Sequence, residues 1–468
     1  MPVTPHQRHN RKRTIYSPQC LNTMKRREFI KYMGAGAAAL ALDSCTPEAA
    51  KNPGKAATSN KDLHGEMLQH YPGIGVLGYG CMRWPQKRNE QGRNVIDQEE
   101  VNRLVDFALE HGVNYFDTSP VYLGGDSERA TAEALNRHPR ESWLIATKMS
   151  VFNATSYDDC VAMYHKSLDI FKTDHLDYYL LHGIGTLNDF NTRFKNTGVM
   201  EFLLKEREAG HIRNLGFSFH GNQEGFDQII ALHDQYHWDF VQIQMNYVDW
   251  EHPNGRNTRA DYLYAELDKR EIPIVIMEPL RGGALSDVPA QIADKLKERE
   301  PERSIASWAF RYVGSFPRVL TALSGMTYME HLQDNLESFL DFQPLDDEEK
   351  KMLLDIATMM EDYPLVKCTA CNYCMPCPYG INIPGIFKFY NDNITAGTYV
   401  KSKEQEHYAR ARRKYLLAYN EAIPTVRQAD HCIACRRCER DCPQNIRIPD
   451  ELRRIDRYIE SLKRETIE

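Results

Sequence analysis

Short apolar runs alternate with longer amphipathic stretches from Ile74 to about Leu345. The short runs predict buried strands, because parallel strands covered on both faces are almost continuously apolar. The stretches between them predict helices, most clearly at Gln98–Glu110, Tyr157–Phe171 and Ala260–Lys269. This alternation predicts an α/β fold, a parallel (β/α)8 TIM barrel over residues 69–350. Its predicted strands are Ile74–Gly80, Asn114–Thr118, Trp143–Lys148, Leu176–His182, Asn214–Phe219, Phe240–Asn246, Ile272–Glu278 and Val319–Ser324.

A glycine pattern, Gly73-x-Gly-x-x-Gly-x-Gly, raises a doubly wound dinucleotide-binding sheet as the rival fold. In that fold the glycines follow the first strand and open a helix. Here they lie on or before the first predicted strand, and no helix follows at once. The pattern is therefore weak evidence, and the barrel is favoured.

Ionisable residues stand where three consecutive predicted strands end. Asp117, Lys148 and His182 close their strands, and Tyr122 follows the first of these within a loop. Barrel enzymes keep their chemistry at the carboxyl ends of the strands, so the four side chains are predicted to converge. A tyrosine hydroxyl has an ordinary pKa of about 10, which a nearby ammonium would lower. Such a hydroxyl could donate a proton to a carbonyl oxygen that receives a hydride, with the histidine orienting that carbonyl.

These four residues resemble the Asp, Tyr, Lys and His tetrad of the aldo-keto reductase superfamily. Gly124-Gly-Asp-Ser-Glu after Tyr122 is similar to the family's Gly-x-Ser-Glu, with one residue inserted. The resemblance implies an oxidoreductase with Tyr122 as acid/base, Lys148 and Asp117 as its tuning pair, and His182 as orienter. The alternative, four unrelated polar residues in a barrel, does not explain why all four occur in order at strand ends.

The same resemblance implies contacts to a nicotinamide dinucleotide. The implied residues are Ser218, Gln242, Arg281, Gly282 and Asn335. Ordinary hydrogen bonding at the barrel mouth is nearly as good an explanation for the first two. Met277 replaces the family's stacking aromatic residue, and Gly325 and His331 replace its phosphate-binding lysine and arginine. A phosphate dianion binds poorly without a fixed cation, so NAD(P)H is a candidate cofactor without strong selectivity for NADPH.

Eight of the twelve cysteines lie after residue 367, within the predicted C-terminal domain, residues 351–468. They form two motifs, Cys368–Cys377 and Cys432–Cys442. The second motif has the bacterial ferredoxin spacing, and the first has one residue fewer before its last cysteine. Ferredoxin spacing predicts two [4Fe–4S] clusters with the fourth ligands crossed. Zinc is the alternative, but four-cysteine zinc sites use two separated pairs. The motifs also resemble the ferredoxin-like tail of an aldo-keto reductase subgroup. The predicted ligands are Cys368, Cys371, Cys374 and Cys442 for one cluster, and Cys432, Cys435, Cys438 and Cys377 for the other.

The first 45 residues resemble a twin-arginine export signal. Arg26 and Arg27 precede an apolar run, Met33–Leu42, which is far shorter than the roughly 20 residues of a membrane-spanning helix. Cys45 follows a sequence similar to a lipoprotein cleavage box, so it is a candidate lipid anchor. The alternative is a basic, alanine-rich tail. We expect an exported protein, periplasmic or membrane-tethered, with residues 46–68 as a linker.

A net charge of −7 argues against nucleic acid as the main partner. Basic residues in 401–414, with Arg436, Arg437 and Arg440, would suit an acidic electron-carrier protein, although a solvated helix face explains them too. The sequence thus predicts an oxidoreductase acting on a small carbonyl or alcohol, coupled to two clusters that exchange electrons with a partner. Two alternatives remain: an electron-transfer module with a silent barrel, and an NAD(P)-dependent reductase with structural clusters.

Overall fold

The computed structural model describes residues 71, 73–152, 156–255, 257–340, 342–400 and 403–464. The predicted export signal with Arg26 and Arg27, the candidate anchor Cys45 and the predicted linker 46–68 all lie outside these residues.

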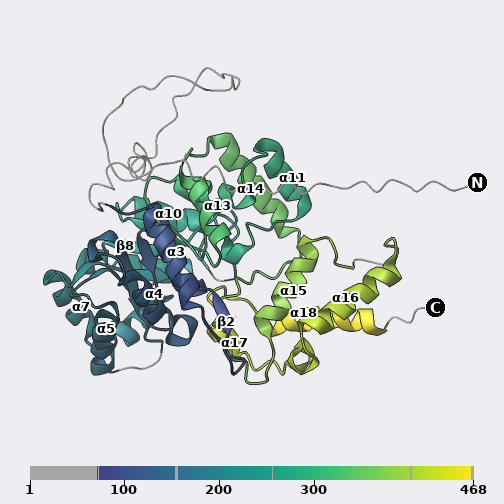
Figure 1. Ribbon diagram of the computed structural model, residues 1–468, viewed down its shortest axis with the longest axis horizontal. Coiled ribbons are helices and arrows are strands. Elements are labelled where there is room, and N and C mark those ends of the chain that lie inside the picture. The colour runs from purple at the N-terminus through teal and green to yellow at the C-terminus, as the bar shows by residue number, and fades with distance from the viewer. Residues whose placement is uncertain are drawn as a thin grey trace, which may run out of the picture. The chain divides into compact units, whose positions relative to one another are not determined.

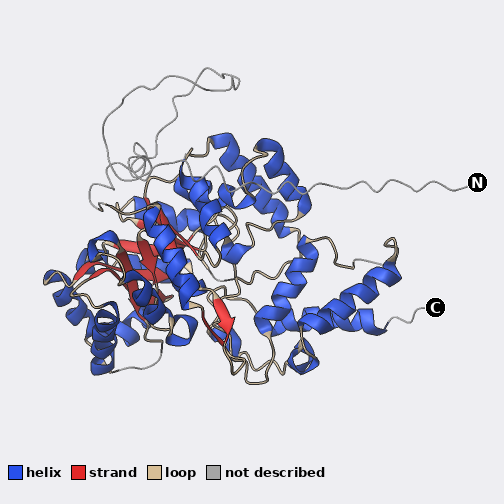
Figure 2. Cartoon of the chain, in the orientation of Figure 1, coloured by secondary structure: helices blue, strands red, loops and turns tan. Residues whose placement is uncertain are grey.

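Eight parallel strands close into a barrel in the order β1-β10-β9-β8-β7-β6-β5-β4, which confirms the predicted fold class. In Figure 2 the strands (red) form an inner layer with helices (blue) around it. Strand β6 continues two residues beyond the predicted end at His182. The strands are β1 (Leu77–Gly80), β4 (Tyr115–Asp117), β5 (Leu144–Met149), β6 (Leu176–Ile184), β7 (Ile212–Phe219), β8 (Phe240–Gln244), β9 (Ile274–Met277) and β10 (Val319–Ser324).

Helices connect the strands and cover the outside of the barrel. Helix α3 (Gln98–Glu110) buries Val101, Leu104, Val105 and Ala108, which recur at helical spacing on one face. Helix α5 (Tyr157–Phe171) begins with a capping box between Ser156 and Asp159. The other helices of this part are α4 (Ser127–Leu135), α6 (Leu187–Phe190), α7 (Val199–Glu208), α8 (Gln223–Ile230), α9 (His233–Tyr236), α10 (Ala260–Asp268), α11 (Ala290–Arg299), α12 (Ile305–Gly314), α13 (Met329–Leu340) and α14 (Asp347–Glu361).

The inside of the barrel is packed with side chains from alternate strand positions. Tyr115, Tyr178 and Phe240 belong to this inner cluster and meet edge to face, with centroid distances of 4.9 and 5.2 Å. Successive strand residues face opposite sides of a sheet, so a residue two positions further along faces inward as well. Asp117 follows Tyr115 at that spacing on β4, and Lys148 follows the inner residue Ala146 on β5. The strand period therefore aims the ionisable residues into the mouth of the barrel.

The C-terminal part is helical and has its own small core. Helices α15 (Ile383–Thr395), α16 (Tyr408–Ala422) and α18 (Ile448–Arg464) pack against one another, as Figure 1 shows. Their contacts bury residues such as Phe387, Tyr415 and Ile455. The first cysteine motif lies in the irregular segment between α14 and α15. The second lies between α16 and α18, where there are short turns at η7 (Thr425–Arg427), η8 (Ala429–His431) and α17 (Arg437–Arg440).

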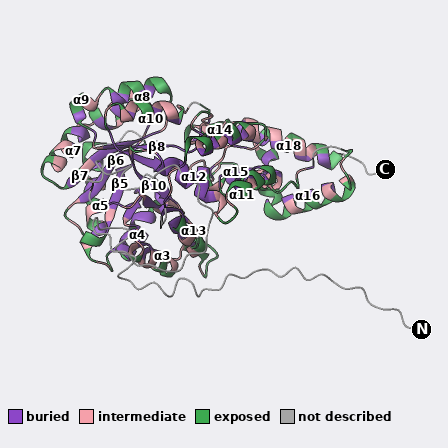
Figure 3. Cartoon of the chain, turned by 90° about the horizontal axis from the view of Figure 1, so that it is seen from above, coloured by how far each residue is buried: buried purple, intermediate pink, exposed green. Residues whose placement is uncertain are grey.

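A two-stranded hairpin after the first barrel strand was not anticipated from the sequence. Strands β2 (Gln86–Arg88) and β3 (Asn94–Ile96) pair antiparallel and are mostly exposed. Figure 3 shows buried residues concentrated on the barrel strands and exposed residues on the outer helix faces. Over the described ranges, no helix combines the length and apolar character needed to cross a membrane.

Candidate active site and cysteine motifs

Lys148 and Asp117 form a buried ion pair at the barrel mouth. Lys148 Nζ donates to Asp117 Oδ1 at 2.6 Å and to the Thr118 carbonyl at 2.8 Å. Burial raises the pKa of Asp117, and the neighbouring Lys148 and the Gln242 amide oppose that shift. Burial likewise lowers the pKa of Lys148, with Asp117 opposing. The pair therefore fixes the ammonium in place, as the sequence predicts.

Tyr122 lies over this pair. It begins the short turn η3 (Tyr122–Gly125), and Lys148 Nζ stands 5.0 Å from its ring centroid. Burial raises the pKa of Tyr122 well above 10, and the charges of Tyr373 and Asp117 raise it further. The expectation that the ammonium would lower this pKa is therefore wrong. The lysine charge is directed at Asp117, and burial disfavours the phenolate.

His182 completes the tetrad on the far side of Tyr122. The two rings meet edge to face with centroids 5.7 Å apart. His182 Nδ1 lies 2.6 Å from Ser150 Oγ and 3.3 Å from Ser119 Oγ. Burial lowers the pKa of His182 well below 6.5, with the charges of Lys148 and Arg193 adding to the effect. The imidazole is therefore neutral, and its orientation is set through Nδ1.

A second tyrosine reaches the tetrad from the first cysteine motif. Tyr373 stands between Cys371 and Cys374, and its side chain lies close enough to Tyr122 to raise the pKa of that tyrosine. Lys148 and His182 meet the ring of Tyr122, and among the described residues neither is hydrogen-bonded to its hydroxyl.

The residues implied to hold a dinucleotide are engaged within the protein. Ser218 Oγ accepts from the Gly183 amide at 2.8 Å, and Asn335 Nδ2 donates to Ser324 Oγ at 2.9 Å. The Gln242 Oε1 atom is buried and has no hydrogen-bond partner within the described chain, so it alone keeps a free acceptor for a carboxamide.

Arg281 and Gly282 at the turn η6 (Arg281–Gly283) do not form a free phosphate cradle. Arg281 Nη2 donates to Asn254 Oδ1 at 2.6 Å and lies 3.1 Å from Asp249 Oδ1. Gly282 packs directly on Thr369 from the cysteine-rich part. A dinucleotide pyrophosphate does not fit these two residues as they stand. Asp249 and Asn254 already hold Nη2 of the Arg281 guanidinium, and Thr369 covers Gly282.

The cysteines of the two motifs fall into mixed groups. Burial raises the pKa of Cys368 to about 11 and of Cys371 to about 12, and Cys442 from the second motif adds to both shifts. Cys374 is shifted in the same way, and Cys442 acts on it too. The first three cysteines of the first motif therefore share Cys442 as an electrostatic neighbour.

The second group has Cys438 at its centre. Burial raises the pKa of Cys438 to about 12, with further contributions from Cys432, Cys377 and Cys435. The electrostatic neighbours of these thiols come from both motifs, and the crossed ligation that the sequence predicts stays a prediction. Within the described residues no three His, Cys, Asp or Glu side chains gather closely enough to hold a single metal ion.

A family model described as the aldo/keto reductase family matches residues 76–357. The chain belongs to the aldo/keto reductase family. A second model, described as a 4Fe-4S dicluster domain, matches residues 364–446. The donor set fits that description, because it supplies eight cysteines in two groups of four. The sequence-based recognition of both parts is confirmed.

Relatives of this reductase resemble its barrel part. The chain is 23% identical over 314 residues to the uncharacterized oxidoreductase YqkF of Bacillus subtilis, covering 60% of this chain and 92% of that protein. It is 29% identical over 141 residues to D-arabinose 1-dehydrogenase of Saccharomyces cerevisiae, covering 28% of this chain and 39% of that protein. Among solved structures, aldo-keto reductase AKR11C1 from Bacillus halodurans in its holo form is 22% identical, with a TM-score of 0.49 and coverage of 60% and 92%.

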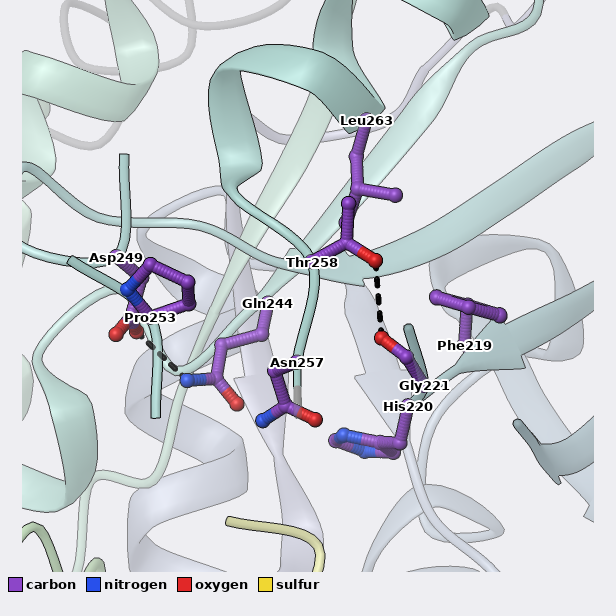
Figure 4. Close-up of a pocket in the computed structure, with 9 residues that line it drawn as sticks. All are labelled: Phe219, His220, Gly221, Gln244, Asp249, Pro253, Asn257, Thr258 and Leu263. Atoms are coloured by element: carbon purple, nitrogen blue, oxygen red, sulfur yellow. Dashed lines mark hydrogen bonds between the residues drawn. The ribbon is translucent and has the colours of Figure 1, made fainter. Parts of the chain in front are cut away.

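Two depressions lie beside the tetrad rather than over it. The first is a cavity of about 10 Å³ where β7 and β8 end, lined by residues including His220, Gln244 and Asn257 (Figure 4). Its volume suits no more than one water molecule. The second, of about 720 Å³, is an open surface hollow bounded by α8 and α10 residues such as Gln223 and Tyr262. Neither holds a tetrad residue, so neither is the reaction site.

Sequence reasoning missed Ser150 and Tyr373. Ser150 could have been found, because it stands two residues beyond Lys148 at the end of β5 and faces inward by the strand period. No pattern in the neighbouring sequence indicates a role for Tyr373, because its contact with Tyr122 joins residues far apart along the chain.

Proposed function

We propose that this aldo/keto reductase interconverts a small carbonyl compound and its alcohol, with Tyr122 as acid/base and with electrons exchanged through two [4Fe–4S] clusters. One observation carries the proposal: Tyr122 is packed against Lys148 and His182 and also lies beside Tyr373 of the first cysteine motif. One side chain thus joins the reductase tetrad to the cluster-binding part.

The barrel residues would act on the substrate oxygen. Reduction of a carbonyl to an alcohol takes two electrons and two protons. The two clusters would supply one electron each, and solvent would supply the proton of the new C–H bond. A high pKa keeps Tyr122 protonated at neutral pH, so its hydroxyl would donate the other proton to the carbonyl oxygen as that oxygen gains negative charge. Neutral His182 would orient the same oxygen through the nitrogen that Ser150 leaves free. Asp117 would hold the Lys148 ammonium beneath the Tyr122 ring, and this ammonium would stabilise the substrate oxygen electrostatically.

The C-terminal part would hold the clusters. Cys368, Cys371, Cys374 and Cys442 would bind one, and Cys432, Cys435, Cys438 and Cys377 the other. Bound clusters would supply single-electron transfer, which a reductase working by hydride alone does not need.

An acidic one-electron carrier protein is the proposed partner. Cys435 is exposed, and the apolar side chains of Ile433 in the same motif and Val426 in η7 are 61% and 74% exposed. Arg437 and Arg440 on α17 add positive charge at the same motif. Exposed apolar side chains together with basic side chains in the same motif suit a transient complex with an acidic partner.

The test is a metal inventory combined with turnover. Purified protein should contain iron and sulfide near eight atoms of each, as two [4Fe–4S] clusters require by composition. With a reduced viologen as donor, it should reduce members of a panel of small aldehydes and ketones. Tyr122→Phe should retain both clusters and lose turnover. Stoichiometric zinc, or full turnover without the Tyr122 hydroxyl, would refute the proposal.

Export through a twin-arginine signal at Arg26 and Arg27 is also proposed, on the sequence motif alone. Replacing both with lysine should leave the protein in the cytoplasm. An unchanged location would refute export, and mass spectrometry of the mature N-terminus would decide whether Cys45 carries lipid.

A further inference from the structure

The geometry points to a replacement at the barrel mouth: the loop of the first cysteine motif, residues 368–374, occupies the groove where reductases of this family would bind a nicotinamide dinucleotide. This protein would therefore take no NADH or NADPH there. The inference rests on family membership and on the contacts of this loop, and it does not depend on the proposed carbonyl chemistry.

The contact between Gly282 and Thr369 fills the phosphate end of the groove. A Cβ placed on Gly282 would lie 2.6 Å from both Cα and Cβ of Thr369, so the two backbones touch. Thr369 is 1% exposed. Its carbonyl accepts a hydrogen bond from Arg83, whose side chain packs on Gly325. Gly325 stands where the family resemblance expects a phosphate-binding lysine, so the nearby cation serves the loop rather than a phosphate.

Arg281 fastens the same loop through a buried network. Its partner Asn254 donates to the Lys367 carbonyl at 3.2 Å and to Gln444 Oε1 at 2.8 Å. Gln444 in turn donates to Gln244 Oε1 at 3.0 Å. These groups are almost fully buried, and breaking such a network leaves polar atoms unsatisfied. The residue that the resemblance assigns to pyrophosphate is therefore a structural link to the cysteine-rich part.

Charge at this site also opposes a dinucleotide. Asp249 lies 3.1 Å from the Arg281 guanidinium and accepts from Gln244 at 2.6 Å. A buried carboxylate beside the only cation at the turn η6 leaves no net positive charge there for a pyrophosphate dianion. At the other end of the loop, Tyr373 lies beside Tyr122, where a nicotinamide ring would have to approach. The loop thus covers both ends of the groove.

Dinucleotide binding by the full-length holoprotein is the first test. All five tryptophans lie in the barrel, so energy transfer from tryptophan to bound NADPH or NADH would report occupancy of the groove. We expect no saturable signal, in fluorescence or calorimetry, up to about 1 mM of either nucleotide. Saturable one-to-one binding in the micromolar range, or NADP released from the purified protein on denaturation, would overturn the inference while leaving the proposed cluster chemistry standing.

A matched glycine pair tests the position of the loop itself. Gly282 and Gly283 both have positive φ, 69° and 102°, so alanine is strained at either. Only at Gly282 does the new Cβ meet Thr369, whereas at Gly283 the nearest atom is Ser286 Oγ at 3.9 Å.

Hydrogen exchange of residues 368–374 is the measurement. Gly282→Ala should raise exchange there, and Gly283→Ala should leave it unchanged. Equal exchange in the two variants would overturn the inference, because it would place the loop away from Gly282. If Gly282→Ala does not fold while Gly283→Ala does, that difference supports the contact, and the nucleotide titration on the unmodified protein still decides binding.

Discussion

The barrel and the cysteine-rich part are held together by different means. The barrel has a closed ring of hydrogen-bonded parallel strands, with one apolar cluster inside and a large one beneath its helices. The cysteine-rich part has a small core on α15, α16 and α18, and its cysteine motifs lie in irregular segments. Backbone in such segments lacks the regular ladders that stabilise strands and helices.

This difference explains where each part can place chemistry. A rigid barrel can keep a lysine and an aspartate buried as a pair, because the surrounding strands fix the geometry. The cysteine-rich part depends on what its thiolates bind, because metal binding and folding are coupled in such domains. The two parts meet at several contacts, and one of these is between Tyr122 and Tyr373, where the barrel strands fix the position of the first tyrosine.

Removing the proposed clusters should have the largest effect, and the loss of protection should be confined to the cysteine-rich part. Chelation of the iron under oxidising conditions should expose residues 364–464 to protease and to hydrogen exchange, whereas the barrel should keep its protection. Exchange measured by mass spectrometry would show both regions in one experiment. As a control, Cys160→Ser should keep full iron content, because Cys160 is a buried residue of α5 in the barrel. A cysteine-rich part that stayed protected without iron would contradict this account.

Two tyrosines, one from each part, should differ in their effect on turnover. Tyr122→Phe removes the positioned acid and should lower the rate by roughly 10²–10⁴-fold. Tyr373→Phe removes only a neighbouring hydroxyl, worth about 1 kcal/mol, and should lower the rate by roughly fivefold. Viologen-coupled turnover would measure both, with the electron paramagnetic resonance of the clusters as a check on integrity. Equal losses would show that the two hydroxyls act as one unit.

Removing the lysine of an ion pair should lower the unfolding free energy far more in the barrel than in the cysteine-rich part. Lys148→Met leaves Asp117 buried without its cation, which should cost about 3–5 kcal/mol of unfolding free energy. The exposed pair Lys388–Asp392 on α15 is the control, and Lys388→Met should cost only about 0.3–0.5 kcal/mol. Urea unfolding followed by tryptophan fluorescence for the barrel, and by exchange for α15, would give both values. A small cost for Lys148→Met would mean that Asp117 is neutral in the folded protein.

Much of the barrel could be predicted from sequence, because its signals are local and repeated. Apolar runs of strand length recur between amphipathic stretches, and several helix bounds match the predicted ones, as at α3 and α5. The inward direction of Asp117, Lys148 and His182 also follows from the strand period. The hairpin β2–β3 was missed because its short, exposed strands carry no apolar run.

The dinucleotide contacts could not be judged from sequence, because their outcome depends on a distant segment. Arg281 and Gly282 match the expected positions, yet their partners come from Asn254, Asp249 and Thr369. The sign of the Tyr122 pKa shift was wrong for a related reason. Sequence shows that a lysine is near, but burial and the direction of its ammonium decide the shift.

The smallest predicted effect is a pH dependence of barrel stability through His182. Burial holds the pKa of folded His182 well below 6.5, while an unfolded histidine titrates near 6.5. Below about pH 6.5 the unfolded chain binds a proton that the folded barrel does not, so stability falls as pH falls, by up to about 1.4 kcal/mol per pH unit. Buried Asp117, whose pKa is raised, contributes in the opposite direction, so only a difference between variants isolates the histidine.

That difference is between the unmodified protein and His182→Gln. Urea unfolding between pH 7.5 and 5, followed by the barrel tryptophans, should show a steeper loss of stability in the unmodified protein. The exposed His407, at the start of α16 in the other part, is the control, and His407→Gln should keep the unmodified slope. If His182→Gln kept that slope as well, His182 would have to be accessible to protons in the folded barrel. The neutral imidazole assigned to the substrate oxygen would then be wrong.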